Sequence, residues 1–510
     1  MAKNLMVQGT SSGAGKSIVA TALCRILTQD GYSVAPFKSQ NMALNSFVTD
    51  KGLEMGRAQV VQAEACNKIP RVEMNPLLLK PAGNNISQII YMGRIYDNLE
   101  SSEFKKIKPD LIPGIKDAYD TLASENDIII IEGAGSPAEI NMNENDIANM
   151  GMADLADSPV ILVADIDRGG VFASIYGTIM LLKEEHRERI KGIIINKFRG
   201  RAELLEDGIL KIEQLTGKPV LGIIPYINIE LEDEDSITEK QHKMKSDKSS
   251  IHIEIVRLKH ISNATDFDIF RRYDDVTVRY TDLDSEFTNP DLIIIPGTKN
   301  TVEDLVSFKK SKLYNQLYEL NRKKGIPIIG ICGGFQMLGL NISDPLGVES
   351  DIKEISGLGL LAHDTIFESE KETVQSKAII KSVFSEDSIF YGLEDMEICG
   401  YELHCGKTNI DHQKDIVFSE TFEKLGKKHV QIDGIMNSEN NVMGSYLHGI
   451  FDNTKFTETI LNNLRNKKGI PEPSSSNFDL QEFKKNEYDK LEEHFRKYLN
   501  LNRIYEIIQL

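Results

Sequence analysis

One short segment in the second half of the chain strongly limits what this sequence can fold into. An apolar run, residues 326–331, leads into Gly-Ile-Cys-Gly-Gly with Cys332 at its centre, and residues compatible with a helix follow. This pattern predicts a nucleophile elbow, the tight strand-to-helix turn that exposes a reactive side chain. A thiolate there lies at a helix N-terminus, where backbone N–H groups stabilise negative charge. The alternative is a buried cysteine in a glycine-rich turn.

Length and charge narrow the class of protein. The chain has 510 residues, more than one ordinary hydrophobic core supports, so we expect at least two domains. Its net charge of −18 argues against a nucleic-acid binder. The sequence shows no signal peptide, no apolar run of membrane-spanning length and no C-x-x-C spacing. We therefore expect a cytoplasmic enzyme that binds neither nucleic acid nor membrane, with homo-oligomerisation left open.

The N-terminal region contains a phosphate-binding pattern. A strand-like run, residues 4–8, leads into a glycine-rich loop ending in Lys16 and Ser17, and a helical pattern then runs to Asp30 with Gly31 as its stop. Strand, loop, Lys-Ser and helix are together the context of a P-loop. Backbone N–H groups would bind phosphate, Lys16 would reach the outer phosphates, and the Ser17 hydroxyl would bind Mg²⁺.

Two charged residues follow predicted strands of this half. Lys38 follows the strand at 33–37, at the sheet edge where ligands collect in open α/β folds. Glu132 follows the apolar strand at 127–131, where an acid binds Mg²⁺ or positions its water. Taken alone, the first is equally a solvated lysine and the second a helix cap. The predicted nucleotide-binding residues are Gly9, Thr10, Gly13, Gly15, Lys16, Ser17 and Lys38.

Weaker signals lie around these residues. Residues 39–46 are rich in amides rather than charges, which suits a large polar ligand or an Asx-rich turn. Glu54, at the start of a predicted helix over 54–63, is a candidate Mg²⁺ ligand beside Ser17 and Glu132. Asp146, in a loop-to-helix region, is a candidate catalytic residue that orients the substrate, and it is equally an N-cap.

The second half supplies partners for the elbow cysteine. Gly297 follows the strand at 291–296, where its N–H would stabilise an oxyanion. A cysteine nucleophile needs a base, and His448, between an apolar run and a predicted helix, is the best placed. His404 is its rival.

Alternating strands and helices in both halves predict an α/β protein with parallel sheets. We divide the chain into a P-loop domain at residues 1–230 and a second α/β domain at 251–455. The charged residues 231–250 are typical of a linker. Residues 456–510 form a helical tail in this division.

These motifs resemble known families. The second half resembles class I, triad-type glutamine amidotransferase domains, which are flavodoxin-like. The P-loop has one residue more than the common form and resembles the dethiobiotin-synthetase branch. The chain as a whole resembles the cobyric acid synthase family. The sequences that carry this last resemblance include Ala-Pro-Phe-Lys-Ser-Gln-Asn-Met at 35–42, Met-Asn-Pro at 74–76 and Glu-Gly-Ala-Gly-Ser-Pro-Ala-Glu at 132–139.

The resemblance implies two coupled half-reactions. Cys332 would attack the side-chain amide of glutamine and release ammonia, with His448 as base and acid and the Gly333 and Gly297 N–H groups as oxyanion donors. In the P-loop domain, ATP with Mg²⁺ would phosphorylate a substrate carboxylate, and ammonia would displace the phosphate. The implied substrate is a corrinoid, adenosylcobyrinic acid a,c-diamide, amidated at its b, d, e and g carboxyls to adenosylcobyric acid in cobalamin biosynthesis.

One departure and three alternatives remain. Many glutaminases carry His-x-Glu, but Ile450 stands at that position, so the Cys–His pair has no assigned third member. The nearest alternative is cobyrinic acid a,c-diamide synthase, against which the polar loop after Lys38 argues. The others are a non-catalytic P-loop partner protein, against which Cys332 and His448 argue, and a stand-alone glutaminase regulated by nucleotide.

Overall fold

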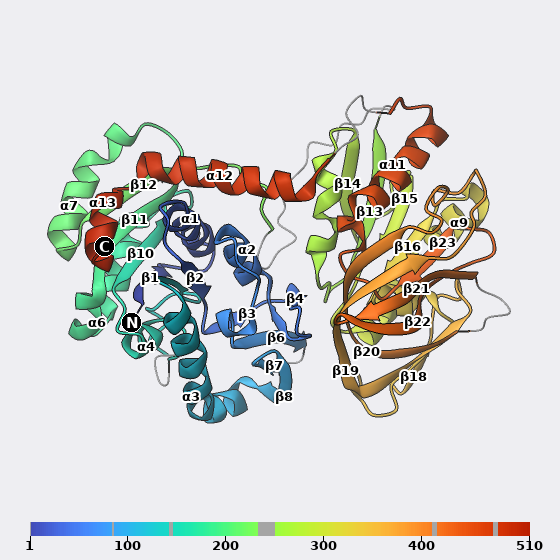
Figure 1. The fold of residues 1–510 in the computed structure, drawn as a ribbon, viewed down its shortest axis with the longest axis horizontal. Helices are drawn as coiled ribbons and strands as arrows, with labels where there is room; N and C mark the ends of the chain where they lie inside the picture. The colour runs from blue at the N-terminus through green and yellow to red at the C-terminus, as the bar shows by residue number, and fades with distance from the viewer. Residues whose placement is uncertain (1, 84–85, 142–145, 233–249, 411–415, 473–477) are drawn as a thin grey trace.

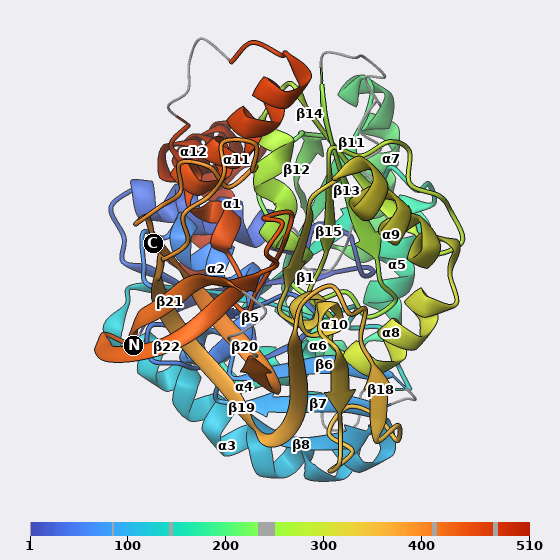
Figure 2. The same cartoon turned by 90° about the vertical axis from the view of Figure 1, so that its right-hand side faces the viewer.

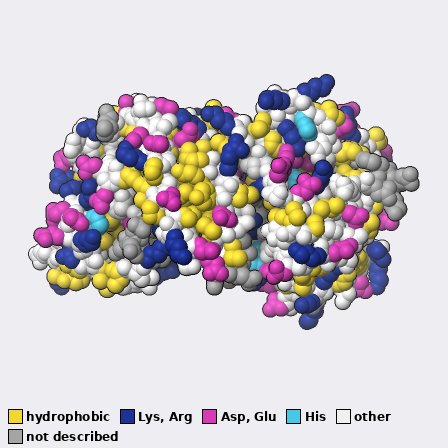
Figure 3. Space-filling view, turned by 90° about the horizontal axis from the view of Figure 1, so that it is seen from below, with side chains coloured by type: hydrophobic (Ala, Val, Ile, Leu, Met, Phe, Trp, Pro, Cys, Tyr) yellow, Lys and Arg dark blue, Asp and Glu magenta, His cyan; other side chains and the backbone are white. Residues whose placement is uncertain are grey.

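A computed structural model of the chain describes residues 2–83, 86–141, 146–232, 250–410, 416–472 and 478–510. The chain forms two lobes, and one long helix from the end of the sequence runs between them (Figure 1). Both lobes carry acidic and basic side chains on the face seen from below (Figure 3). No helix in the described ranges has the length and apolar character needed to cross a membrane. The predicted linker falls almost entirely outside these ranges.

The first lobe is built on a six-stranded parallel sheet in the order β12-β11-β10-β1-β9-β2. Its strands are β1 (Lys3–Gly9), β2 (Val34–Phe37), β9 (Ile128–Glu132), β10 (Val160–Asp165), β11 (Ile190–Phe198) and β12 (Val220–Pro225). Each lies within a few residues of a predicted strand. The isoleucines of β9 alternate between two cores, because helices cover both faces of the sheet.

The helices of this lobe begin with α1, which follows the P-loop. They are α1 (Lys16–Gln29), α2 (Arg57–Ala65), α3 (Ser101–Glu125), α4 (Met150–Leu155), α5 (Val171–Leu181), α6 (Glu184–Arg189) and α7 (Glu206–Thr216). The side chains of α1 pack in one core and those of α3, α5 and α7 in the other. The parallel sheet covered on both faces is therefore the predicted fold.

Two small sheets between β2 and α3 were not predicted. One has the order β3-β6-β7-β8, and the other pairs β4 with β5. Their strands are β3 (Gln40–Met42), β4 (Ser46–Val48), β5 (Glu54–Gly56), β6 (Leu77–Gly83), β7 (Ile86–Tyr91) and β8 (Arg94–Glu100). Glu54 consequently lies in a strand, and the helix predicted to start there starts at Arg57.

The second lobe contains an eleven-stranded sheet. Its parallel part consists of β14 (Val276–Asp282), β13 (Ile251–Arg257), β15 (Leu292–Ile295), β16 (Ile328–Ile331) and β23 (Val442–Ser445). A curved, mostly antiparallel extension faces the viewer in Figure 2. It consists of β17 (Asn341–Ser343), β18 (Glu354–Ser356), β19 (His363–Ile380), β20 (Glu397–Ile410), β21 (Ile416–Lys424) and β22 (Lys427–Met436).

The helices at the end of the chain are divided between the lobes. The side chains of α11 (Thr454–Lys468) belong to the core of the second lobe, so this segment is not part of a separate tail. By contrast, α12 (Leu480–Tyr498) and α13 (Leu501–Ile508) pack in a core of the first lobe (Figure 1). An ion pair of 2.6 Å between Arg25 of α1 and Asp489 of α12 reinforces this contact.

Candidate active site

Cys332 lies in a tight turn between β16 and α10 (Gly333–Leu338). Its backbone has φ 51° and ψ −108°, a strained conformation that is typical of a nucleophile elbow. Neighbouring glycines have no room for a side chain: a Cβ on Gly334 would lie 2.0 Å from the Ile295 carbonyl oxygen. The predicted strand, turn and helix are thus present in the predicted order.

A buried histidine and a buried aspartate complete the site. His448 Nδ1 lies 2.7 Å from Asp266 Oδ2, and the Gly449 N–H donates to Asp266 Oδ1 at 3.2 Å. Burial lowers the pKa of His448, but the Asp266 carboxylate and the neighbouring Cys332 side chain raise it more strongly, to about 10. Cys332 and His448 line the same cavity, and Cys332 Sγ donates to the Leu403 carbonyl oxygen at 3.7 Å. The three side chains form a Cys–His–Asp triad with a protonated imidazole at neutral pH.

The two glycines predicted as oxyanion donors border this triad. A Cβ on Gly297 would lie 2.9 Å from His448 Cε1, and a Cβ on Gly333 would lie 3.1 Å from the Thr298 backbone nitrogen. Neither position accepts a side chain. Both glycines therefore lie close to the triad, which fits the predicted role of their N–H groups as donors to an oxyanion oxygen.

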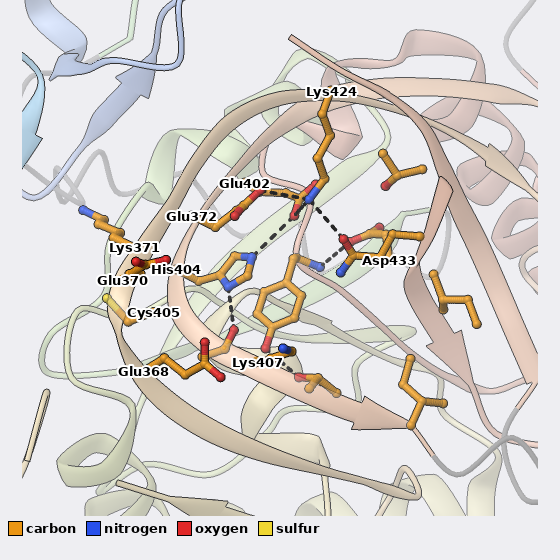
Figure 4. Close-up of a pocket in the computed structure, with 17 residues that line it drawn as sticks. Glu368, Glu370, Lys371, Glu372, Glu402, His404, Cys405, Lys407, Lys424 and Asp433 are labelled. Carbon is orange, nitrogen blue, oxygen red and sulfur yellow. Dashed lines mark hydrogen bonds and ion pairs between the residues drawn. The ribbon is translucent and has the colours of Figure 1, made fainter. Parts of the chain in front are cut away.

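The rival histidine, His404, has other contacts. Its ring stacks on Tyr446 with centroids 3.7 Å apart, and its Nδ1 lies 2.7 Å from the Gly406 carbonyl oxygen. It lines the cavity at Cys332 and a second, charged cavity next to it, which Figure 4 shows with Glu402 and Lys424. The contacts of Cys332 and Asp266 favour His448 as the base.

The cavity at Cys332 includes a residue of the first lobe. Lys80, from β6, lines it together with Lys299, Glu349 and Lys371 of the second lobe. Three lysines thus line the cavity beside one carboxyl, Glu349, whose pKa burial raises to about 7. Because Lys80 belongs to the first lobe and the other three residues to the second, both lobes line this cavity.

The P-loop has the geometry of a phosphate cradle. Gly13 and Gly15 have φ of 72° and 97°, which side chains disfavour. A Cβ on Gly15 would lie 2.1 Å from Asn196 Nδ2, which donates to the Ala14 carbonyl oxygen at 3.1 Å. Lys16 Nζ donates to the Ser11 and Gly135 carbonyl oxygens at 3.1 and 2.9 Å. The lysine thus folds back over the loop, where the outer phosphates of a nucleotide would lie.

Glu132 brings several of the predicted residues together. It is fully buried; its Oε1 accepts from Ser17 Oγ at 2.8 Å and pairs with Lys38 Nζ at 3.0 Å, and its Oε2 accepts from Gln62 Nε2 at 2.5 Å. Carboxylate and hydroxyl oxygens are the donors that Mg²⁺ prefers, and it usually keeps water and phosphate oxygens as further ligands. Ser17 and Glu132 fit such a site. Across the described ranges, no group of three or more His, Cys, Asp or Glu could hold a metal by itself.

Two predicted residues have different surroundings. Glu54 is buried between Lys80, at 2.9 Å, and Lys371 of the second lobe, at 2.6 Å. These contacts do not bring it to Ser17 and Glu132, so its assignment as a Mg²⁺ ligand finds no support in them. Asp146 accepts backbone N–H groups at the start of α4, including Asn149 at 3.1 Å and Gly151 at 3.0 Å, as an N-terminal cap does. It also lines the cavity of the first lobe.

That cavity connects the P-loop with the amide-rich loop. Its lining includes Lys16, Lys38, Gln40, Asn41, Met42, Gly135, Asp146 and Asn149. Among the described residues, Gln40 Oε1 and Asn149 Oδ1 are buried without a hydrogen-bond partner. Buried polar atoms are normally satisfied. A polar ligand in this cavity would supply the missing partners.

A phosphate cradle in one lobe and a Cys–His–Asp arrangement in the other are the two sites that a glutamine-dependent amide ligase needs. Residues 5–236 match the CobQ/CobB/MinD/ParA nucleotide-binding domain, and residues 252–456 match the CobB/CobQ-like glutamine amidotransferase domain. The chain is 47% identical to a cobyric acid synthase of Thermoanaerobacter sp. over 100% of this chain and 99% of that one. It is 49% identical to one of Streptococcus sanguinis, with the same coverage.

The chain belongs to the cobyric acid synthase family. It is an ATP-using amide ligase of cobalamin biosynthesis that takes its nitrogen from glutamine. Asp266 is the one member of the triad that sequence reasoning missed. It follows β13, whose carboxyl end lies at the same sheet edge as those of β15, β16 and β23, and this position is the only signal that marks it.

Proposed function

We propose that the second lobe hydrolyses glutamine through the Cys332–His448–Asp266 triad. The thiolate attacks the side-chain amide carbon, and the resulting oxyanion accepts the Gly333 and Gly297 N–H groups. His448 donates its proton to the nitrogen, the C–N bond breaks, and ammonia leaves a thioester on Cys332. Water, deprotonated by His448, then releases glutamate. The observation that carries this proposal is the 2.7 Å pairing of His448 with Asp266 beside the elbow cysteine.

The first lobe would activate the acceptor carboxylate. A carboxylate is a poor electrophile, so its oxygen attacks the γ-phosphorus of ATP, ADP leaves, and ammonia then displaces phosphate from the acyl phosphate. Lys16 and Lys38 would neutralise the phosphate charge. Ser17 and Glu132 would hold Mg²⁺, which supplies positive charge for the phosphates of ATP. The convergence of Ser17 and Lys38 on one Glu132 oxygen supports this arrangement.

The substrate that we propose is adenosylcobyrinic acid a,c-diamide, amidated at the b, d, e and g carboxyls. Both relatives are named cobyric acid synthase, and the chain matches each over 99% of its length. A cavity with unpartnered amide oxygens on Gln40 and Asn149 suits a ligand that carries N–H donors, and the a and c amides of this substrate are such groups. We further propose that the chain acts in the cytoplasm and that residues 1–230 and 251–455 work as its synthetase and glutaminase domains. A homo-oligomer stays a prediction.

Labelled glutamine tests the substrate. The chain is incubated with ATP, Mg²⁺, the a,c-diamide and glutamine carrying ¹⁵N in its side-chain amide, and the product is analysed by NMR. We expect label at the b, d, e and g amides and one ADP for each amide formed. Turnover of cobyrinic acid itself, with label only at the a and c positions, would contradict the proposal and favour the sister enzyme.

A further inference from the structure

The first lobe reaches into the glutaminase site through two consecutive residues, Asn45 and Ser46. Asn45 Oδ1 accepts the backbone N–H of Ala264 at 3.1 Å, and the Ser46 N–H donates to Asn263 Oδ1 at 2.9 Å. The two asparagines thus make reciprocal hydrogen bonds across the lobes. Each is at most 5% exposed, so water does not compete for these bonds.

On the second-lobe side, this contact holds the segment that contains the triad residue Asp266. Asn263, in a left-handed conformation, caps the 3₁₀ helix η3 (Ala264–Arg272), and its carbonyl oxygen accepts the N–H of Asp266 at 3.0 Å. The preceding residue, Ser262, donates its N–H to the Gly297 carbonyl oxygen at 3.0 Å. One short segment therefore fixes both the triad acid and a predicted oxyanion donor, and the first lobe holds that segment at Asn263 and Ala264.

A second contact reaches the histidine itself. The Ser46 carbonyl oxygen accepts from Tyr401 Oη at 3.2 Å. The ring of Tyr401 stacks on His448 with centroids 5.2 Å apart, and the two backbones exchange hydrogen bonds of 3.1 and 2.9 Å. Both peptide groups of Ser46 thus contact elements that position His448.

In the other direction, the same segment leads to the synthetase cavity. Gln40, Asn41 and Met42 line that cavity, and only three residues separate them from Ser46. Gln40 Oε1 is among the buried atoms without a partner in the described structure. The far end of the segment is hydrogen-bonded to Asn263, Ala264 and Tyr401. Asn263 and Tyr401 in turn bond to the backbones of Asp266 and His448.

We propose that residues 40–46 form a relay through which occupancy of the synthetase cavity sets the position of Asp266 and His448. Asn45, Asn263 and Tyr401 are its positioning residues. The inference rests on the proposed function of both sites. Coupling between sites travels through contiguous hydrogen-bond networks of this kind. The relay limits ammonia release to enzyme that holds ATP and an acceptor, because misplacing a triad group by a fraction of an ångström slows attack on glutamine.

The test compares Asn45→Ala, Asn263→Ala and Tyr401→Phe with the unchanged enzyme. Glutamine hydrolysis is measured with and without ATP and the corrinoid, and amide formation is measured with ammonium chloride in place of glutamine. We expect stimulation of glutamine hydrolysis by ATP and corrinoid to fall about tenfold or more. The effect falls on kcat rather than on the KM for glutamine. Ammonia-dependent amidation by Asn263→Ala and Tyr401→Phe, which alter only the second lobe, stays within about twofold. Tyr401→Phe keeps the stacked ring and removes only the bond to Ser46, so it reports on the relay even where an asparagine variant fails to fold.

Gln375→Ala is the matched control. Gln375 donates across the same interface to the Val48 carbonyl oxygen and has no described hydrogen bond to the triad. An equal loss of stimulation in this variant would overturn the relay in favour of general docking. Unchanged stimulation in all three relay variants would also overturn the relay. So would a loss of stimulation accompanied by a loss of ammonia-dependent amidation. A failure of the proposed function shows separately, as glutamine hydrolysis without amide formation in the unchanged enzyme.

Discussion

Asp266 lies 182 residues before His448 in the chain, and their side chains meet at 2.7 Å. The carboxylate is buried, and it accepts both the imidazole Nδ1 proton and the Gly449 N–H. It therefore fixes the orientation of the His448 ring and stabilises the imidazolium, the two roles of the acid in a catalytic triad.

Asp266→Asn tests this role with almost no change of shape. The amide cannot stabilise the imidazolium, so we expect the kcat for glutamine hydrolysis to fall by about 100-fold or more. Amidation with ammonia should be unaffected, because the synthetase site is intact. Glutaminase activity within about twofold of the unchanged enzyme would remove Asp266 from the triad.

The charge state of His448 has a consequence for stability. Its pKa is raised from 6.5 to about 10, so the stability that its charged form contributes is complete below pH 6.5 and is lost as the pH rises through about 10. We expect the Tm of the second lobe to fall between pH 7 and pH 10. In Asp266→Asn, the fall should be smaller. Parallel Tm profiles for the two proteins would show that another group is responsible.

The residue-level misses have a common cause. The elbow and the P-loop are marked by local sequence, and each forms the predicted strand, turn and helix. His448 lines the cavity at Cys332, and the catalytic roles of both residues stay predictions. Asp266 and the asparagine pair make contacts with residues 182 or more positions away in the chain. Asp266 and Asn263 lie in a segment without a motif, and the amide-rich loop that contains Asn45 gives no sign of its partner. The ion pair of Glu54, a candidate Mg²⁺ ligand from the sequence, was likewise not predictable, because its partner Lys371 is 317 residues away.

At the scale of elements, the strands of both parallel sheets were predictable because each is a short apolar run followed by a polar or glycine-rich loop. The small sheets of the first lobe were not. Strands β3, β4 and β5 have three residues each, too few for a period to be recognised. β3 pairs with the edge of β6, β4 and β5 pair with each other, and a Cβ on Gly56 would lie 2.6 Å from Asn41 Nδ2 and 2.9 Å from Asn75 Oδ1.

Two glycines separate the effect of backbone strain from the effect of a close contact in the P-loop. Gly15 and Gly31 have nearly equal φ, 97° and 95°, but only Gly15 faces a close atom, Asn196 Nδ2 at 2.1 Å from an added Cβ. We expect both alanine variants to lose about 1 kcal/mol of stability from the positive φ. Only Gly15→Ala should lose ATP binding, measured by calorimetric titration. Equal ATP affinity in the two variants would contradict the prediction that the loop around Gly15 binds the phosphates of ATP.

At the scale of the whole molecule, the chain returns to the first lobe after it has formed the second. Helix α12 crosses to the first lobe, where Leu491 and Phe495 are fully buried beside α1 (Figure 1). The last helices of the chain are thus part of the nucleotide-binding lobe, although the glutaminase domain precedes them in sequence.

Phe495→Ala should therefore destabilise the first lobe. We expect a loss of about 3–5 kcal/mol, the usual cost of removing a buried phenylalanine. In calorimetry, the transition that ATP shifts upward should move to lower temperature. Lys485→Ala, an exposed position of the same helix, is the control and should leave the transition in place. If the ATP-sensitive transition is unchanged in Phe495→Ala, the tail does not stabilise this lobe.

The most direct measurement of the two-site account is corrinoid amidation by Cys332→Ser, supplied either with glutamine or with ammonium chloride at raised pH. The account predicts amidation with ammonia at close to the rate of the unchanged enzyme and none with glutamine, because Cys332 acts only in releasing ammonia. Loss of both activities in a folded protein would contradict it, because the cysteine would then belong to the synthetase chemistry.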